Sequence, residues 1–293
     1  IGRIKVSLIK YEVFNAVIEY GSLTKAAEAL NLTQSAISYS ISNLESELGF
    51  SLLIRHRSGV SLTSDGERIL KYIRAILHAE EKMKQEAASI TGLEVGTIRI
   101  GAFTSVCIKW LPGLMKRFKQ DHPSIEIKIL QGGYRDIEQW ITNGSIDFGF
   151  VSLPTAESFT ITPLKEDRLV CIVPSNHPLS NKGRIRFEQL EEESFIVQKS
   201  GYDNDINRLF KETGITLKNK FEMSDDQAII AMVENNLGVS IIPELVLQGL
   251  SPKCSILRLE PEQYRTIAIA TPNSTEISPV SKKFIEYVKT ELR

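Results

Sequence analysis

The chain has 293 residues, of which 42% are hydrophobic and 24% charged, and its 35 basic and 36 acidic side chains leave a formal net charge of −1. This length suits two or three globular domains, and the charge balance excludes a general attraction to nucleic acid or to an acidic membrane. The N-terminus lacks a secretory pattern, and no apolar run approaches the ~18 residues of a membrane span. With three scattered cysteines as well, these features indicate a cytoplasmic protein with reduced thiols and no membrane partner.

Three short helices with tight connections are predicted near the N-terminus. Apolar residues at helical spacing mark the first helix, which Gly21 ends, and small residues at 26, 27 and 30 let the second helix cross it closely. Ser22 or Thr24 can cap the second helix, and Thr33 can cap the third. The third helix has an apolar stripe that ends at Gly49 and consists of Ile37, Ile41, Leu44 and Leu48. This is the helix-turn-helix arrangement, whose second helix enters the DNA major groove.

The face of the third helix opposite this stripe is polar where a surface helix would normally carry charge. Short polar side chains can exchange hydrogen bonds with bases and phosphates without holding the helix away from the groove. The DNA contacts predicted from this helix are Thr33, Gln34, Ser35, Ser38, Tyr39 and Ser42. The alternative is a polar, solvated helix in an ordinary bundle.

A small β-hairpin is predicted at residues 54–63, where the sequence IRHRSGVSLT has a glycine turn followed by alternating apolar residues. Such a wing would hold Arg55 and Arg57 toward a phosphate backbone. Residues 1–68 carry seven basic and seven acidic side chains. DNA affinity would therefore depend on where the basic residues are placed and on two or more copies of this N-terminal DNA-binding region, called the reader below.

The run FNAVIEYGSLTKAAEALNLTQSAISYSISNLESELGFSLLIRHRSGVSLTSDGE closely resembles the winged helix-turn-helix of LysR-type transcriptional regulators. The resemblance rests on GSLTKAAEAL, TQSAIS, LESELG, the Arg55 position and LTSDG. The chain departs from the family pattern at Leu53, where Phe is usual, and at Ser58, where a second wing arginine is common. Tyr39 and Ser42 stand where some members have basic residues. These departures bear on the operator sequence and leave the DNA-binding role as the resemblance implies it.

A long helix is predicted from residue 65 to about residue 90. Four apolar residues repeat there at intervals of seven, namely Ile69, Ile76, Met83 and Ile90. At ~1.5 Å per residue the helix is a rod of ~40 Å, and a heptad stripe of this length favours a coiled-coil-like seam. The family resemblance implies that this helix pairs two subunits into a dimer, with a tetramer as the further expectation. The alternative is packing against the chain's own C-terminal part.

Beyond a predicted hinge at residues 91–96, strands and helices alternate. Strands centred near residues 100, 128 and 149 leave room for one helix between each pair, which is the spacing of a parallel sheet. The helices expected in this region contain residues 111–118, 134–143, 203–214, 226–237 and 279–292. Further strands are expected at 168–174, 195–201, 219–225, 238–244 and 266–272.

The predicted fold class is α+β and multi-domain. It comprises a winged helix-turn-helix at 1–64, a linker and dimerisation helix at 65–92 and a two-lobed α/β effector domain at 93–293. We expect lobe one to hold residues 93–167 and 268–293, and lobe two residues 168–267. The family resemblance implies that the chain returns to lobe one, as in periplasmic solute-binding proteins.

A ligand cleft is predicted between the two lobes, because ligands of open α/β sheets bind outside the carboxyl ends of strands. The residues predicted to bind the effector are Phe103, Thr104, Ser105, Gln131, Ser152, Gln198, Lys199, Met223 and Ile242, with Ser200 beside them. Such groups suit a small polar metabolite with a carboxylate. Taken singly, residues such as Thr104 could equally be helix caps.

The resulting functional prediction is a transcriptional regulator that binds double-stranded promoter DNA and a small effector, with RNA polymerase as a further candidate partner. No GxSxG, GxxxxGK[ST], GxGxxG or metal-binding spacing is present, so we expect neither an enzyme, a metal site nor a cofactor. One alternative is a thiol or redox sensor, because Cys107 lies one turn into a predicted helix. Another is a transport-type solute-binding protein, which the N-terminal reader opposes.

Overall fold

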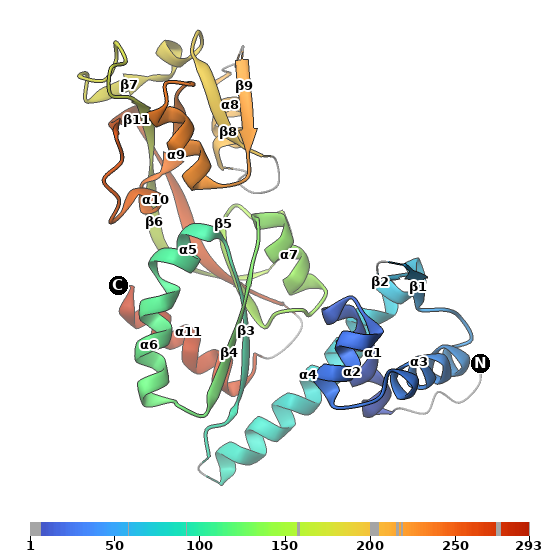
Figure 1. The fold of residues 1–293 in the computed structure, drawn as a ribbon. Coiled ribbons are helices and arrows are strands. Elements are labelled where there is room, and N and C mark those ends of the chain that lie inside the picture. Colours follow the sequence, from blue (N-terminus) through green and yellow to red (C-terminus); the bar gives the residue numbers. More distant parts are fainter. Residues whose placement is uncertain are drawn as a thin grey trace. The chain divides into compact units, whose positions relative to one another are not determined.

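The computed structural model describes residues 7–57, 59–91, 93–156, 159–199, 205–214, 217, 219–273 and 277–292. The chain divides into two compact units. Unit 1 holds residues 1–93 together with 142–145, and unit 2 holds residues 94–141 and 146–293. The fold is thus mixed α and β, with helices dominating unit 1 and a large sheet in unit 2 (Figure 1).

Unit 1 contains the three predicted helices, the predicted hairpin and the predicted long helix. Their bounds are α1 Leu8–Tyr20, α2 Leu23–Leu30, α3 Gln34–Leu48, β1 Leu53–His56, β2 Gly59–Leu62 and α4 Ser64–Ile90. Gly21 and Gly49 end α1 and α3 in the left-handed conformation, with φ of 61° and 85°, which glycine adopts without steric cost. Ser22 and Thr33 cap α2 and α3, because their side chains accept from the backbone N–H of Lys25 and Ala36.

The core of unit 1 joins all four helices. Phe14, Ile37 and Ile41 are fully buried between α1, α2 and α3, and Leu70 and Ile73 bring the first half of α4 into the same cluster. The small residues Ala26 and Ala27 on α2 are buried there too. Local capping and this shared core together fix the angle at which α3 leaves the turn after α2.

Unit 2 is built around a seven-stranded sheet in the order β10-β6-β11-β5-β3-β4, with β7 beside β11. A separate two-stranded sheet pairs β8 with β9. The strands are β3 Gly96–Ala102, β4 Ile125–Gln131, β5 Phe148–Leu153, β6 Thr160–Pro174, β7 Arg184–Arg186, β8 Ser194–Gln198, β9 Asn219–Met223, β10 Ser240–Pro243 and β11 Cys254–Thr271. The helices are α5 Thr104–Lys109, α6 Leu111–Asp121, α7 Tyr134–Thr142, the 3₁₀ helix Phe187–Leu190, α8 Asp205–Thr213, α9 Asp226–Glu234, α10 Glu244–Leu247 and α11 Pro279–Glu291.

The predicted parallel pairing is confirmed, because β3 runs parallel to both β4 and β5. The helix expected over residues 111–118 is α6, which a break at Trp110 separates from the six-residue α5. Residues 203 and 204 of the predicted helix 203–214 lie outside the described residues, as does Gly92 in the predicted hinge.

Two strands are far longer than the sequence predicted. In place of short strands at 168–174 and 266–272, β6 and β11 span 160–174 and 254–271 and pair antiparallel along most of their length (Figure 1). The added stretches contain Pro163 and Pro261, which argue against a strand in the sequence, although Leu257 and Leu259 alternate ahead of Pro261. Each added stretch is held in extended form by its partner. The pair thereby links the β3–β5 half of unit 2 to the β8–β9 half.

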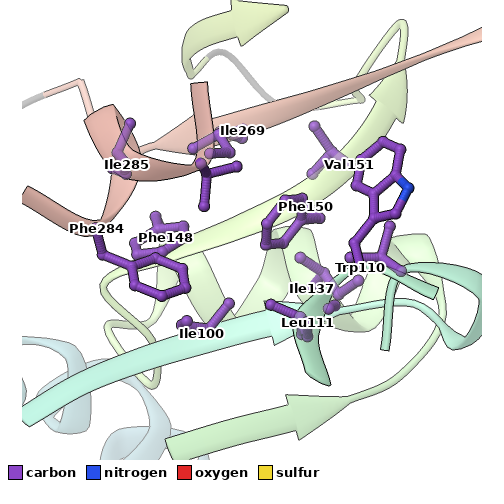
Figure 2. Close-up of a cluster of buried hydrophobic side chains, with 14 of the residues drawn as sticks. Ile100, Trp110, Leu111, Ile137, Phe148, Phe150, Val151, Ile269, Phe284 and Ile285 are labelled. Carbon is purple, nitrogen blue, oxygen red and sulfur yellow. The ribbon is translucent and has the colours of Figure 1, made fainter. Parts of the chain in front are cut away.

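Aromatic and branched side chains fill the core of the first half of unit 2. Figure 2 shows Phe148 on β5 beside Phe284 of α11, and Phe150 on the same strand near Trp110. Because α11 packs here, the C-terminal helix returns to the half of unit 2 that begins with β3. The second half has its own clusters, centred on residues such as Phe195 and Ile229.

Candidate functional site

The predicted DNA-contacting face of α3 is exposed in unit 1. Thr33, Gln34, Ser35, Tyr39 and Ser42 are exposed, and the side chain of Tyr39 is 71% accessible. The Thr33 and Ser35 hydroxyl oxygens lie 3.0 Å apart. A large aromatic ring that is mostly exposed to solvent on a helix is available for contact with a partner.

The hairpin holds its basic residues beside this helix. β1 and β2 are antiparallel, and the Val60 N–H donates to the Gly21 carbonyl at 3.1 Å, which ties the hairpin to the end of α1. Arg55 is exposed, and its guanidinium donates to the hydroxyl of the half-buried Ser38 at 3.3 Å. Arg57 is exposed in the turn, and Ser58 lies outside the described residues. The polar face of α3 and the arginine on β1 therefore form one continuous surface.

The apolar stripe of α4 is partly buried in its first half and exposed in its second half. Ile69 and Ile76 are partly buried against the core of unit 1. Farther along, Met83 is 66% exposed and Ile90 is 80% exposed, and Tyr72 is exposed on the N-terminal half. The second half of the stripe is thus an apolar surface on an extended helix.

Unit 2 contains a small cavity between its two halves. Its wall is formed by Phe103, Thr104, Ser105, Gly132, Tyr134, Gln198, Asp226, Pro243 and Arg265. Its empty volume is about 310 Å³ with open solvent included, but the inner space open to the centre of a water-sized group is only about 20 Å³. That inner space admits one water-sized group.

Four of the nine residues predicted for the effector line this cavity, namely Phe103, Thr104, Ser105 and Gln198. The other five lie elsewhere. Gln131 is exposed and donates to the Thr104 hydroxyl at 3.1 Å; Ser152 is buried; Lys199 is exposed; Met223 and Ile242 pack in a hydrophobic cluster. Pro243, the next residue on β10, reaches the cavity in place of Ile242, because successive side chains of a strand point to opposite faces. Ser200 lies outside the described residues.

Arg265 on β11 lies at the centre of the cavity wall and was not predicted. Its guanidinium forms a buried ion pair with Asp167 at 2.7 Å and donates to the Tyr134 hydroxyl at 2.8 Å and to the Ser105 hydroxyl at 2.9 Å. The guanidinium also lies 5.0 Å from the centre of the Phe103 ring. Both partners of the ion pair fall just outside the strand bounds expected from the sequence, so no pattern marked them as strand residues facing a cleft.

Hydrogen bonds that Asp205 accepts connect the two halves of unit 2. This buried carboxylate on α8 accepts from the Tyr134 hydroxyl at 3.0 Å and from the Ser152 hydroxyl at 2.8 Å. From the same helix, Arg208 donates to the carbonyl of Leu153 at 2.9 Å. Ser152 is therefore part of the contact between the halves of unit 2.

Asp226, the first residue of α9, is a second unpredicted charge in the wall. It is 7% exposed, and its carboxylate accepts from the Gln198 amide at 2.8 Å. Burial raises the pKa of this carboxyl from 3.8 to about 6, against the opposing effect of Arg265, while the neighbouring Asp225 raises it further. A perturbed carboxyl in a cleft is typical of a functional site.

Comparison with known proteins agrees with both units. Residues 8–67 match the family described as bacterial regulatory helix-turn-helix protein, lysR family, and residues 91–293 match the LysR substrate binding domain. The chain belongs to the LysR-type transcriptional regulators. It is 36% identical over 287 residues to an uncharacterized HTH-type transcriptional regulator, YvbU of Bacillus subtilis, covering 97% of this chain and 98% of that one.

Two solved structures illustrate the likeness in fold. A cysteine-to-aspartate variant of full-length OxyR from Pseudomonas aeruginosa superposes with a TM-score of 0.79 at 22% identity, covering 99% of this chain and 96% of that chain. The effector-binding domain of QuiR, solved in complex with shikimate, superposes with a TM-score of 0.61 at 25% identity, covering 68% of this chain and 98% of that domain. The α+β architecture of a LysR-type regulator is thus confirmed.

The redox alternative for this LysR-type regulator has no support from the environment of Cys107. Burial raises the pKa of its thiol to about 11, so the group is protonated at neutral pH and is a poor nucleophile. Its Sγ–H donates to the Ala102 carbonyl at 3.5 Å. Because α5 has only six residues, its dipole is too small to offset this burial.

Neither a metal centre nor a membrane span is found among the described residues. These contain no group of three or more His, Cys, Asp or Glu side chains that could hold a metal ion. None of their helices combines the length and the apolar character needed to cross a lipid bilayer.

Proposed function

We propose that this LysR-type regulator controls a bacterial promoter by reading an operator with α3 and the β1–β2 wing of two or more copies. In this proposal the reader is residues 1–64, the pairing helix is 65–92 and the effector domain is 93–293. Lobe one of that domain is residues 93–167 with 268–293, and lobe two is 168–267. The observation that carries the proposal is the continuous polar surface of α3 and Arg55, exposed on a helix-turn-helix of the lysR family.

Base reading is assigned to the exposed side chains at the start of α3, chiefly Gln34, Ser35 and Tyr39. A Gln amide can bond two atoms of an adenine edge, and short hydroxyls let the helix lie deep in the groove. Arg55 and Arg57 are assigned to the phosphate backbone, where they add affinity without sequence preference. Thr33 is both the cap of α3 and a candidate phosphate contact, whereas Ser38 orients Arg55.

Self-association is assigned to the exposed half of the α4 stripe around Met83 and Ile90. An apolar stripe on a 27-residue helix is a surface that a second α4 would cover. Two linked readers bind one operator with far higher avidity than one, which offsets the lack of net positive charge in the N-terminal region. Assembly into tetramers and contact with RNA polymerase belong to the same proposal, as do a non-enzymatic role and a cytoplasmic location.

The cavity of unit 2 is assigned to a small polar effector. Thr104, Ser105 and Gln198 offer hydrogen bonds from both halves of the unit, and Phe103 gives one apolar wall. The QuiR domain, at 25% identity, was solved with shikimate, a small hydroxylated carboxylate. A ligand of that size would fit only if the halves separated, because the inner space is about 20 Å³. A ligand that prefers one separation of the halves would then shift the population of DNA-binding conformations.

Selection of bound fragments from a genomic library tests the proposal with the full chain. We expect recovery of fragments that share a two-fold related sequence, with an affinity that falls steeply as salt rises. The double variant Gln34→Ala, Ser35→Ala is the matched test, since both residues are exposed outside the core of unit 1. If the wild-type chain enriched no sequence, or if the double variant enriched the same fragments equally well, the assignment of α3 would be wrong.

A further inference from the structure

The carboxylate of Asp226 has a hydrogen-bonding capacity that the fold leaves unfilled. Among the residues that the structure describes, Gln198 is its one hydrogen-bonding partner, and only one of the two carboxylate oxygens, Oδ1, takes part in that bond. The side chain lines the cavity while being 7% exposed. Holding the ionised carboxylate away from bulk water is unfavourable, and its second oxygen, Oδ2, is open to the cavity rather than enclosed by protein.

The start of α9 does not need this carboxylate. The preceding residue, Asp225, is the N-cap, and its exposed side chain accepts from the Ala228 N–H at 3.0 Å. Because the cap is already present, Asp226 accepts no capping hydrogen bond, and its contribution at the helix terminus is limited to its favourable position near the positive end of the helix dipole. Its position in the wall is therefore unexplained by helix capping.

The charge of Asp226 also lacks a partner in contact. The nearby cation, Arg265, is bound to Asp167 at 2.7 Å, and that ion pair is neutral as a whole. No ion pair of Asp226 occurs within the part of the chain described by the structure. With Arg265 and Asp167 cancelling, the charge that remains in the cavity wall is negative.

We propose that the effector carries a protonated primary amine and that Asp226 receives it in the inner part of the cavity. This inference rests on the proposed function of the cavity and names the chemical class of its ligand. An ammonium group is about as large as the single water-sized group that the cavity admits, and the rest of the ligand requires the halves to separate. The ammonium donates to the second carboxylate oxygen and neutralises its charge. A hydroxyl could donate the same hydrogen bond but would leave the charge uncompensated.

The rest of the ligand extends toward Thr104 and Ser105 at the opposite wall. The Thr104 hydroxyl oxygen accepts from Gln131, so its own proton is available to a ligand acceptor. Ser105 accepts from Arg265 and can likewise donate its proton. A small amino acid or amino alcohol has this combination, with an ammonium at one end and an acceptor at the other.

Thermal-shift and calorimetric titrations of the full chain test the proposal. The probes are the standard amino acids and simple amino alcohols, each compared at millimolar concentration with the α-hydroxy or α-keto acid of the same skeleton. We expect at least one amine to bind and its hydroxy counterpart to bind far more weakly. Asp226→Asn should weaken amine binding by about 30-fold or more, because it removes one charge of a buried pair. Asp225→Asn is the matched control, with the same charge change one residue away on an exposed cap, and should bind as wild type.

A ligand-free measurement separates ligand binding from a structural role. Asn retains the shape of Asp226 and the acceptor for Gln198, so Asp226→Asn should raise the melting temperature of the empty protein near neutral pH, whereas a structural carboxylate would give a lower one. A lower melting temperature, binding of no amine, or undiminished amine binding by Asp226→Asn would each overturn the proposal. If hydroxy or keto acids bound in the cavity as tightly as the amines, the proposed amine would be wrong, but the cavity would still be the effector site. Loss of operator binding by the wild-type chain would instead count against the proposed function.

Discussion

At the scale of single residues, the cavity wall contains Arg265, which is paired with Asp167, and one carboxylate, Asp226, that contacts no cation among the described residues. Arg265 and Asp167 form a buried pair, and buried pairs contribute little net stability but are costly to break on one side. Asp226 lies in the same wall with a raised pKa and no contacting cation among the described residues. In our proposal the charge of Asp226 lowers the stability of the ligand-free protein but is needed for ligand binding.

The first prediction is a pH-dependent gain in stability from Asp226→Asn. The wild-type carboxyl has a pKa of about 6 when folded and 3.8 when unfolded, so the folded state binds more protons between these values and loses stability as pH rises through them. The charged groups that set this shift besides burial are Arg265 and Asp225. The variant has no such loss, and its advantage in free energy of unfolding should grow to the order of 2–3 kcal/mol at neutral pH. Urea unfolding of both proteins between acid and neutral pH measures it. An advantage that did not change with pH would contradict the assignment.

The second prediction separates base reading from phosphate binding. Gln34→Ala should change the preference among operator bases by roughly 1–3 kcal/mol, because its amide would no longer contact a base edge. Arg57→Ala should weaken all DNA sequences alike and reduce the salt dependence of binding. Competition binding on an operator and its single-base variants, at two salt concentrations, distinguishes the two. The reverse pattern would place the arginine at the bases and Gln34 at the backbone.

At the scale of elements, the N-terminal half of the α4 stripe packs within unit 1 while the C-terminal half remains exposed. Ile76 packs against the core of unit 1, so a charge at that position would also damage the reader. Met83 is 66% exposed and makes no such contribution. It is therefore the position where self-association can be tested without unfolding unit 1.

The third prediction is that Met83→Glu breaks the assembly. A carboxylate in a seam between two α4 helices would be buried without a partner, which is strongly unfavourable. We expect a shift to monomers in analytical ultracentrifugation and a loss of operator affinity of roughly 10-fold or more, as avidity is lost. Met83→Leu conserves volume and should behave as wild type. A Met83→Glu chain that sedimented like wild type would show that this half of α4 faces solvent.

At the scale of the whole molecule, the proposed regulator works by coupling two binding events. The effector acts only through its different affinity for the DNA-bound conformations, so its influence on DNA must equal the influence of DNA on the effector. We propose the cavity as the basis of this coupling, because its wall takes Thr104 and Ser105 from one half of unit 2 and Gln198 and Asp226 from the other.

The fourth prediction is that Thr104→Val uncouples the effector from DNA. Valine keeps the shape of threonine but removes the hydroxyl that accepts from Gln131 and faces the ligand, so ligand affinity should fall by about 10-fold. The change that a binding compound causes in the operator footprint should then require correspondingly more compound. Cys107→Ala, whose side chain is not in the cavity wall, is the control and should respond normally. A lost response in Cys107→Ala with a normal one in Thr104→Val would return the thiol alternative.

Features that depend on local spacing could be predicted from the amino-acid sequence alone. The cap at Thr33, the ends at Gly21 and Gly49, the hairpin and the apolar stripe of α3 involve residues within a few positions of one another, whereas the structure decided between Ser22 and Thr24 as the cap of α2. Helix periodicity and turn chemistry are expressed over such distances, so one chain is enough to identify them. The parallel pairing of β3 with β4 and β5 followed in the same way from strand spacing.

The residues that surround the cavity become apparent only in the folded chain. Arg265 contacts Ser105 across 160 positions of the chain and Tyr134 across 131, and no local pattern records such pairings. Ile242 and Pro243 exchange roles because strand alternation fixes the facing of each residue only once β10 is paired with β6. Asp226 resembled an ordinary acidic residue at a helix start until its burial was known, and burial is a property of the packed chain because neighbours distant in sequence exclude the water.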